Sequence, residues 1–421
     1  MSYEEANRAA IISYFQEGAK GSHSLCALGV EVEHFVVHAE GLRAVPYEGS
    51  GDEIGVHDLL EYLAAYYPEQ TRGLEGDLIG LASDEASISL EPAAQLEISI
   101  APFCSIKRIT EAYERFRSYV DPYLEQHGCR LVTQGYHPSA KAHDLPLIPK
   151  QRYRYMDAYF RELGTHGERM MRASASTQVS IDYADEADAI RKMRVAQALA
   201  VVLSSFVDNT ERFEGELVTK PLTRILIWRD VDNARCGSVP GLFEEDFGFA
   251  AYADWVLRTC PIFVTRPAAD DPNGPDLRSV VGQTAAQAYA DAPMSTADIE
   301  HLLSMFWPDV RLKRFVEIRP ADSLPEELMA AYAALIRGVF YSDESMAAIE
   351  EAFGVKNGVW PLDDHSTDEA IAAVREHGFD ARISGRTLSE WEQLVIGTAR
   401  AALPPDDAQY LSALQRFRPW L

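Results

Sequence analysis

Alternating apolar and polar positions predict the first strand of the chain, at residues 27–38. The stretch "ALGVEVEHFVV" (27–37) is apolar and rich in β-branched residues, except for two glutamates that stand two positions apart. Successive side chains of a strand point to opposite faces, so Glu31 and Glu33 share one face while the valines occupy the other. A solvent-facing surface explains two neighbouring negative charges most simply. The alternative is a positive group that lies between them.

The pattern beyond this strand alternates between helix and strand periods, with no internal repeat. Strands separated by helices, without glycine-rich turns between them, favour an α+β fold over a doubly wound parallel sheet. Residues 265–279 are dense in proline, glycine and aspartate and are expected to form a loop. The segment beyond about residue 346 is expected to be helical and to pack on the outside as a lid or cap. The pattern predicts strands at 88–100, 130–135, 175–184, 222–230 and 311–320, and helices over the first twenty residues and at 55–68, 105–126, 185–207 and 246–258.

The composition is that of an ordinary globular protein, with 47% hydrophobic and 25% charged residues among 421. Acidic residues outnumber basic ones, 65 to 39, and the formal charge of -26 argues against a surface that binds nucleic acid or an anionic membrane. The first twenty residues lack the basic and apolar regions of a signal peptide, and the longest apolar helical stretch, 195–207, is too short to span a bilayer. We therefore expect a cytoplasmic protein.

Motifs for several other kinds of site are missing from the sequence. The five cysteines are odd in number and widely scattered, without a CxxC pair, so neither a zinc site nor a disulfide framework is expected. No GxGxxG follows a predicted strand, and GxSxG and HExxH do not occur. The stretch "EGAKGS" (17–22) lacks the first glycine of a phosphate-binding loop, so we interpret it as a helix end with Gly18 or Gly21 as the cap.

Three further predicted strands carry polar side chains two positions apart. If these strands are neighbours of the first one, their polar faces line one cavity. Ligands made only of oxygen select a hard cation such as Mg²⁺ or Mn²⁺. A solvated face is the simple alternative for each strand taken alone. The polar positions are Gln95 and Glu97, with Glu91 just before them, Glu317 and Arg319, and Ser176, Gln178 and Ser180.

Six blocks of the sequence occur in the order and approximate spacing of the plant-type glutamate–cysteine ligases, and the chain resembles this family from about residue 25 to 346. The resemblance implies a glutamine-synthetase-like α+β fold, in which a curved, mostly antiparallel sheet forms a funnel-like active site and helices pack outside. It implies one catalytic domain over residues 1–421, with a helical C-terminal segment from about 347. The blocks are "LGVEVEHF", "ISLEPAAQLEIS", "LPLIPKQRYRYM", "MMRASASTQVSIDYADEADAIRKMR", "IWRDVDNARCG" and "VRLKRFVEIRPAD".

The activity that the resemblance implies explains the paired glutamates. Such an enzyme joins the γ-carboxylate of glutamate to the amine of cysteine through a γ-glutamyl phosphate, using ATP and Mg²⁺, as the first step of glutathione-type thiol synthesis. Divalent ions held by carboxylates would neutralise the ATP phosphates and orient the transferred group. The implied metal ligands are Glu31, Glu33, Glu97 and Glu317, with Glu91 as a further member.

The resemblance also implies roles for polar and basic residues around the metal. Arg319, with Glu317, would act in catalysis by contacting the γ-phosphate and the developing acyl phosphate; a plain ion pair between the two is the alternative. A planar guanidinium binds a carboxylate through two hydrogen bonds, which suits arginine as a clamp for glutamate. Surface arginines and polar core packing are the alternatives for the remaining positions. These are Arg235 and Arg172 as clamps for glutamate, Gln178 and Thr177 as contacts to glutamate or a metal-bound water, and Lys150 and Arg152 as contacts to the ATP phosphates.

The sequence departs from the family in a few places. Ala93 and Ala94 stand where the family has two glycines, and the segments at 294–308 and 323–335 differ from its usual pattern. Glutamate as the donor is therefore better supported than cysteine as the acceptor. Two alternatives are a carboxylate–amine ligase with another amine acceptor and a non-catalytic nucleotide-binding relative. A site without activity has no need of carboxylates that repel one another, which argues against the second. No partner beyond small-molecule substrates is indicated.

Overall fold

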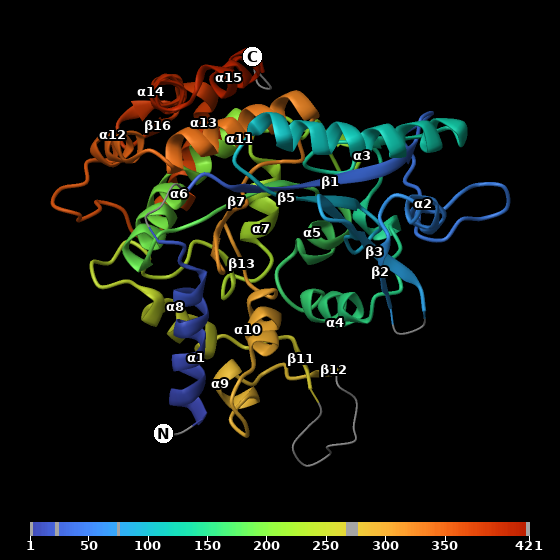
Figure 1. Cartoon of the computed structure of the whole chain (residues 1–421), viewed down its shortest axis with the longest axis horizontal. Helices are drawn as coiled ribbons and strands as arrows, with labels where there is room; N and C mark the ends of the chain where they lie inside the picture. The colour runs from blue at the N-terminus through green and yellow to red at the C-terminus, as the bar shows by residue number, and fades with distance from the viewer. Residues whose placement is uncertain (1–2, 22–24, 74–75, 267–276, 418–421) are drawn as a thin grey trace.

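The computed structural model describes residues 3–21, 25–73, 76–266 and 277–417. One large sheet runs through the middle of the molecule (Figure 1), with strand order β14-β15-β7-β1-β5-β4-β3-β2 and β6 paired to β1. All pairings within this sheet are antiparallel. Its strands are β1 (Leu28–His38), β2 (Glu69–Arg72), β3 (Leu78–Ala82), β4 (Ala86–Leu90), β5 (Leu96–Phe103), β6 (Cys129–Val132), β7 (Thr177–Ile181), β14 (Val310–Leu312) and β15 (Val316–Ile318).

Helices cover both faces of the sheet, which confirms the expected α+β class. On the upper face in Figure 1, α3 (Ile106–Gln126) packs on β5 and β6, and α11 (Glu326–Phe340) packs on β7 and β1. Even-numbered residues of β1 point to this face: Val30 and Val32 are fully buried, and a ring nitrogen of His34 lies 2.7 Å from the Tyr113 hydroxyl of α3. The odd-numbered residues therefore point to the opposite face.

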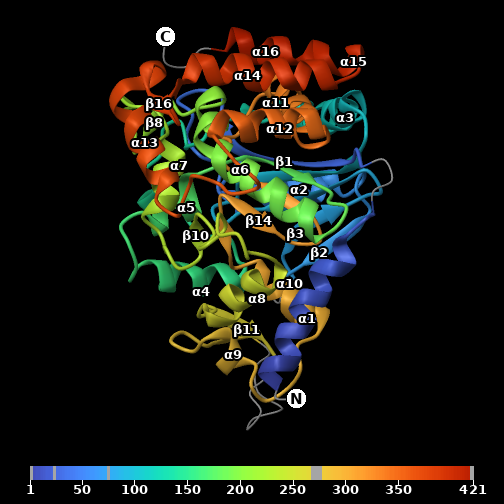
Figure 2. The same cartoon turned by 90° about the vertical axis from the view of Figure 1, so that its left-hand side faces the viewer.

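The C-terminal helices form an outer layer rather than a lid over the sheet's lower face. Figure 2 shows α14 and α16 stacked outside α11, and α14 contacts both α11 and α6. The Cβ position of Gly338 lies only 2.6 Å from the Ala399 carbonyl oxygen, so the two helices cross in close contact. This layer and the long buried α6 comprise α6 (Glu186–Phe206), α12 (Asp343–Phe353), α13 (Ser366–His377), α14 (Leu388–Ala402), α15 (Pro405–Ala408) and α16 (Ser412–Arg416).

Most of the remaining elements lie below the sheet or at its edges, while the β16–β17 pair lies beside α13 and α14 of the outer layer. Figures 1 and 2 place α1, α8, α9 and α10 together at the end of the molecule that holds the N-terminus. No helix among the described residues is long and apolar enough to cross a membrane. These elements are α1 (Tyr3–Gly18), α2 (Val56–Leu63), α4 (Gln151–Phe160), α5 (Gly167–Ala173), α7 (Thr223–Arg229), α8 (Phe249–Arg258), α9 (Ala285–Ala288), α10 (Thr296–Leu303), and the short pairs β8 (Arg212–Phe213) with β9 (Glu216–Leu217), β10 (Cys236–Gly237) with β13 (Trp307–Pro308), β11 (Phe263–Thr265) with β12 (Leu277–Ser279), and β16 (Arg382–Ile383) with β17 (Arg386–Thr387).

Two of the predicted strands are hairpins. The predicted strand 88–100 is β4 and β5, joined by a tight turn in which the Ala94 amide donates to the Glu91 carbonyl and Ala94 adopts a positive φ of 67°. The predicted strand 311–320 is β14 and β15, with Arg311 directly opposite Glu317. In the first of these, the even positions stay apolar across the turn, so the pattern alone did not reveal it. In the second, Arg314 and Phe315 interrupt the alternation at the turn. The turns place Glu91 and Lys313 beside their strands rather than within them.

The predicted strand 222–230 is wrong, because Thr223–Arg229 forms the helix α7. A short apolar run is compatible with either period, and its neighbours decide between them. Here Leu222 adopts a positive φ of 65°, and its amide donates to the buried Asp208 carboxylate at 2.6 Å, which starts the helix. The predicted loop 265–279 lies mostly outside the described residues, and its last three residues form β12. The other predicted helices and strands are present with shifted ends, and α1 ends at Gly18 as expected.

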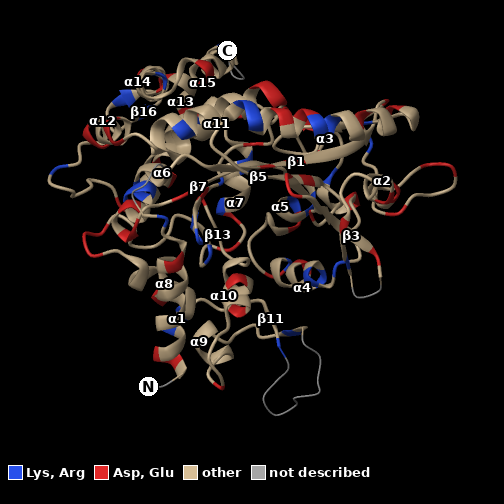
Figure 3. Cartoon of the chain, viewed as in Figure 1, with Lys and Arg blue, Asp and Glu red and all other residues tan. Residues whose placement is uncertain are grey.

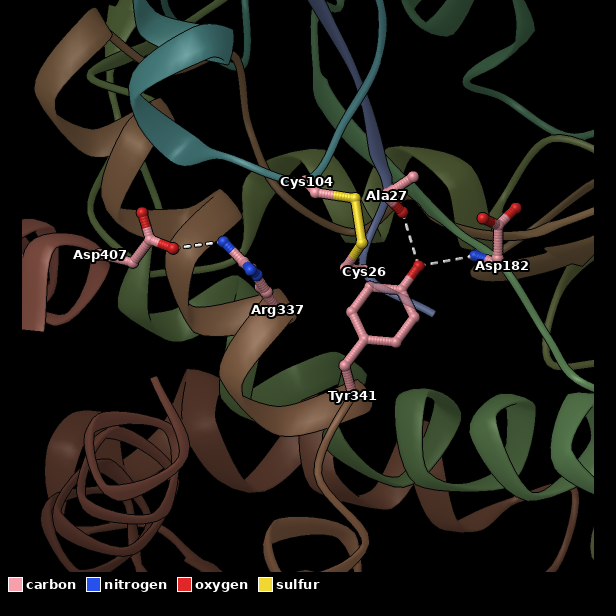
Figure 4. Close-up of a disulfide and its surroundings, with 7 residues drawn as sticks. All are labelled: Cys26, Ala27, Cys104, Asp182, Arg337, Tyr341 and Asp407. Atoms are coloured by element: carbon pink, nitrogen blue, oxygen red, sulfur yellow. Dashed lines mark hydrogen bonds and ion pairs between the residues drawn. A yellow bond between two sulfur atoms is a disulfide. The ribbon is translucent and has the colours of Figure 1, made fainter. Parts of the chain in front are cut away.

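The structure also corrects the expectation of no disulfide. Cys26 and Cys104 are bonded, 78 residues apart in sequence (Figure 4). Leu28 of β1 lies opposite Phe103 of β5, so Cys104, just after β5, lies close to Cys26, just before β1. Antiparallel pairing created this proximity, which sequence spacing does not show. Three further cysteines are free.

Candidate active site

A cavity of about 280 Å³ lies on the sheet face opposite α3 and α11. Strands β1 and β5, the β4–β5 turn and the β14–β15 hairpin form one side of it, and α4, α5 and α7 supply the other. Charged residues occur over the outer helices as well as around the sheet (Figure 3). In this cavity, acidic and basic side chains line the same enclosed space. The charged residues that line the cavity are Glu31, Glu33, Glu91, Glu97, Lys150, Arg152, Arg224, Arg311, Lys313 and Arg319.

Three glutamates form an acidic wall: Glu33 is buried, and Glu31 and Glu97 are half-buried. Glu33 of β1 lies directly opposite Glu97 of β5, and Glu31 is two residues away on the same face. Burial raises the pKa of Glu31 to about 8, helped by the charges of Glu97 and Glu317. Burial and the charges of Glu91 and Glu97 raise the pKa of Glu33 to about 8. Burial and Glu91 raise that of Glu97 to about 7. Such raised values mean that burial and mutual repulsion outweigh the nearby positive charges of Lys313, Arg311 and Arg224.

Hydroxyl and amide groups hold the carboxylates of this wall in place. Glu33 accepts hydrogen bonds from the Ser176 amide at 2.8 Å, the Ser176 hydroxyl at 2.9 Å and the Gln178 side-chain amide at 3.1 Å. Glu97 accepts one from the Ser89 hydroxyl at 2.8 Å. These bonds hold the two carboxyl groups in place without supplying a positive charge.

Glu317 differs from the other glutamates because three cations surround it. Its carboxylate accepts two hydrogen bonds from Arg311, at 2.6 and 2.9 Å, one from Lys313 at 3.3 Å and one from Arg319 at 3.0 Å. Burial alone would raise the pKa of Glu317, but the charges of Arg311, Lys313 and Arg319 hold it well below its usual range. Glu317 is fully buried and does not line the cavity. Its predicted role as a metal ligand therefore conflicts with its contacts, which make it the centre of a basic wall.

Most of the predicted site residues reach the cavity. Glu31, Glu33, Glu91 and Glu97 do, as do Arg319 and Gln178, whose side chains hydrogen-bond each other. Lys150 and Arg152 line it from the start of α4, and burial lowers the pKa of Lys150.

Three predicted substrate contacts lie away from the cavity. Thr177 follows Ser176 in a strand and so points to the opposite face, where its hydroxyl accepts a hydrogen bond from the Leu324 amide. Arg172 pairs with Asp157 at 2.7 Å and with Glu168 at 3.3 Å. Arg235 is 1% exposed and pairs with Asp232 at 2.6 Å. The Arg172 Nε has no hydrogen-bond partner, but the other polar groups of these side chains have partners outside the cavity, so the structure does not support contacts to glutamate for these three residues.

Sequence reasoning missed three cations that the structure brings to the cavity. In "RLKRFVEIR", Arg311 and Lys313 stand two positions apart, a spacing that places both on one face of a strand. The turn after β14 brings Glu317 directly opposite Arg311. Arg224 lies in the segment that was wrongly predicted as a strand. On α7 it is one helical turn from Trp228, and both side chains line the cavity.

The donor atoms of the acidic wall suit a hard divalent ion. No group of three or more Asp, Glu, His or Cys side chains in the described part of the chain is arranged as a ready metal cage. Mg²⁺ does not need one, because it keeps several waters and is commonly bound by one or two carboxylates together with substrate phosphates. The oxygen-only donors of Glu31, Glu33 and Glu97, whose mutual repulsion a cation would relieve, therefore fit Mg²⁺.

Comparison with known proteins shows the family of the chain. Residues 27–356 match the Glutamate-cysteine ligase family 2. Glutamate–cysteine ligase B, chloroplastic, of Oryza sativa subsp. japonica is 31% identical over 83% of this chain and 69% of its own length. The chloroplastic glutamate–cysteine ligase of Arabidopsis thaliana is 32% identical over 82% of this chain and 65% of its own length. The chain thus spans about two thirds of the length of these relatives.

A solved structure shows the same fold. The glutamate–cysteine ligase of Francisella tularensis, in complex with AMP, superposes with a TM-score of 0.52 at 11% identity, over 93% of this chain and 82% of its own. The plant relatives correct one expectation: they are chloroplastic enzymes, which contradicts the cytoplasmic location inferred above. The lack of a secretory pattern carries no information about other compartments. The matched residues and the relatives together place this chain in the glutamate–cysteine ligase family 2.

Proposed function

We propose that this protein is an ATP-dependent ligase that joins the γ-carboxylate of glutamate to the amine of cysteine. The observation that carries the proposal is the cavity between an acidic wall (Glu31, Glu33, Glu97) and a basic wall (Arg311, Lys313, Arg319), in a chain of this family. Phosphates need positive groups, and Mg²⁺ needs carboxylates. A cavity with both is suited to hold a metal–nucleotide complex.

The chemistry proceeds in two steps. A γ-carboxylate oxygen of glutamate attacks the γ-phosphorus of ATP, ADP leaves, and an acyl phosphate forms. The amine nitrogen then attacks the acyl carbon, phosphate leaves, and the nitrogen loses a proton. Charge develops on the phosphoryl oxygens during the first step and on the acyl oxygen during the second, so fixed cations stabilise both.

Residues of the basic wall would supply that stabilisation. Arg319 is held by Glu317 and Gln178 at the cavity, where it is proposed to contact the transferred phosphoryl group. Lys150 and Arg152 face the same space from α4 and are proposed to bind the nucleotide phosphates. The AMP in the solved Francisella enzyme agrees with a nucleotide site in this fold.

The acidic wall would hold Mg²⁺, or Mn²⁺ in its place. Glu31, Glu33 and Glu97 present the carboxylate oxygens, and Glu91 from the adjacent turn is a further candidate. When bound, the ion neutralises phosphate charge and helps to orient the γ-phosphoryl group. We leave Glu317 out of this set because its oxygens already contact three cations.

An apolar part of the cavity is a candidate pocket for the acceptor. Met156, Met170, Met171, Trp228 and Trp307 line it. A small uncharged side chain such as that of cysteine suits this lining better than a charged one does. Another small amine acceptor is the second candidate, because the segment 294–308, which contributes Trp307, departs from the family pattern.

The test is to incubate the protein with ATP, Mg²⁺ and glutamate, vary the amine, and follow ADP release and product mass. We expect γ-glutamylcysteine to form faster than any other product. ADP release with another amine only would show that the acceptor is wrong. No turnover with any amine would contradict the ligase proposal and favour a nucleotide-binding relative.

A variant pair tests the acidic wall. Glu31→Gln is expected to lower ADP release by at least about a hundredfold, because it removes a charge that Mg²⁺ and the phosphates require. Glu69→Gln is the matched control, since Glu69 is an exposed glutamate on β2 of the same sheet and lies outside the cavity. Equal rates for the two variants would make Glu31 part of an ordinary polar strand face.

A further inference from the structure

Helix α7 holds Arg319 through three of its residues. The Arg224 side chain donates to the Arg319 carbonyl oxygen at 3.2 Å. The Arg319 guanidinium lies 5.8 Å from the ring centre of Trp228. Arg229 donates to the Asp309 carboxylate at 2.6 Å, and the Asp309 carbonyl oxygen accepts the Arg319 amide at 3.1 Å. Both the backbone and the side chain of Arg319 therefore depend on this short helix.

Asp309 connects this arrangement to the C-terminal helix α13. Asp309 is 7% exposed, and besides Arg229 it accepts a hydrogen bond from the Gln197 side chain at 3.0 Å. The same Gln197 amide donates to Thr367 of α13 at 3.1 Å, and Asp368 of α13 lies 3.3 Å from the Arg229 guanidinium. Both α13 residues follow residue 356, where the match to the family ends.

The packing around these groups leaves little room for movement. A Cβ atom at Gly237 would lie 2.1 Å from an Arg229 guanidinium nitrogen, so the missing side chain is what admits Arg229. The Gly237 carbonyl oxygen also accepts the Asp309 amide at 2.8 Å. The Asp309 carboxylate accepts two side-chain donors, and the Asp309 backbone makes two further hydrogen bonds, so this buried residue has one favoured position. Removing its charge leaves Arg229 without its main partner.

We propose that Asp309 is a positioning residue through which the C-terminal segment holds Arg319 in its place at the cavity. The proposal rests on the proposed function, which gives Arg319 its role at the transferred phosphoryl group. Helix α13 fixes Arg229 and Gln197, these fix Asp309, and Asp309 and α7 together fix Arg319. A shift of about 1 Å in such a group is enough to lower a rate strongly.

A double-mutant cycle tests this coupling. Asp309→Asn keeps the size of the side chain, and we expect kcat to fall about tenfold while KM for ATP changes less. In an Arg319→Met background the same change is expected to alter the residual kcat less than about twofold, because the residue on which it acts is gone. An equal loss in both backgrounds would indicate a general structural effect and overturn the proposal.

A control variant and a structural readout complete the test. Asp364→Asn is the control, because Asp364 is another acidic residue next to α13. Its carboxylate accepts a hydrogen bond from the Gly241 amide and does not contact Asp309, so kcat is expected to stay unchanged. The crystal structure of Asp309→Asn is expected to show the Arg319 guanidinium displaced from Glu317 and Gln178. If both contacts persist, the proposal is wrong, whether or not the wild-type chain has ligase activity. Lack of turnover in the wild type would instead count against the proposed function alone.

Discussion

The raised pKa values of the acidic wall make stability depend on pH. Glu31 and Glu33 have folded-state pKa values of about 8, above the usual 4.5, so between these values the folded chain binds more protons than the unfolded one. The free energy of unfolding therefore falls as pH rises through this window. Each group contributes at most about 1.4 kcal/mol per pH unit.

Urea unfolding at several pH values, with and without Mg²⁺, measures this effect. We expect the metal-free protein to lose stability from about pH 5 to 8, and Mg²⁺ to restore it at the upper end, because the ion favours the charged carboxylates. A Glu31→Gln variant is expected to show a flatter pH dependence. An unchanged slope in that variant would mean that Glu31 carries no unfavourable charge.

The contacts of Glu317 predict a different response to the same substitution. Glu317→Gln leaves Arg311, Lys313 and Arg319 without their shared counter-charge, and we expect unfolding free energy to fall by about 3–5 kcal/mol. Glu97→Gln, in the metal-free protein, is expected to be neutral or stabilising, because it removes a repelling charge. Comparing both variants by urea unfolding separates the two walls. Similar losses for both would contradict the distinction.

At the scale of elements, the β4–β5 turn carries a conformation that suits glycine. Ala94 has a φ of 67°, in the left-handed region that L residues with a Cβ adopt at a cost. Ala94→Gly is expected to raise the free energy of unfolding by roughly 0.5–1 kcal/mol, since the strain removed exceeds the added chain entropy. Ala93→Gly, without a positive φ to relieve, is the control and is expected to destabilise. Thermal or urea unfolding measures the stability of both variants against the wild type. An Ala94→Gly variant less stable than the wild type would contradict the turn geometry.

At the scale of the whole molecule, we propose that residues 1–421 form one cooperative domain. Helix α14 packs against α11, which in turn packs on the central sheet, and Trp391 of α14 is fully buried. Calorimetry is expected to show a single transition, and a chain cut after residue 356 is expected to aggregate or lack a cooperative transition, because it exposes the outer face of α11. A stable, folded 1–356 fragment would show that the C-terminal segment is a separate unit.

The local patterns predicted much of the fold and the acidic wall. Period-2 alternation placed Glu31 and Glu33 on one face of β1, and the apolar stripe of α6 identified a buried helix. The same rule, applied to β7, would have set Thr177 apart from Gln178, so that error was avoidable. The short run that forms α7 was not predictable in this way, because its helical start depends on Asp208, a contact outside the run.

Sequence by itself determined the family, the α+β class and the face of β1 on which Glu31 and Glu33 lie, since these follow from local order and spacing. Only the tertiary structure decided which charges neutralise one another: that three cations enclose Glu317 while Glu31, Glu33 and Glu97 lie near further carboxylates that repel them, and that Arg172 and Arg235 have partners elsewhere. It also decided the pairing of Cys26 with Cys104. The physical reason is that Coulomb energies and hydrogen bonds depend on distance in space, which the fold sets and separation along the chain does not.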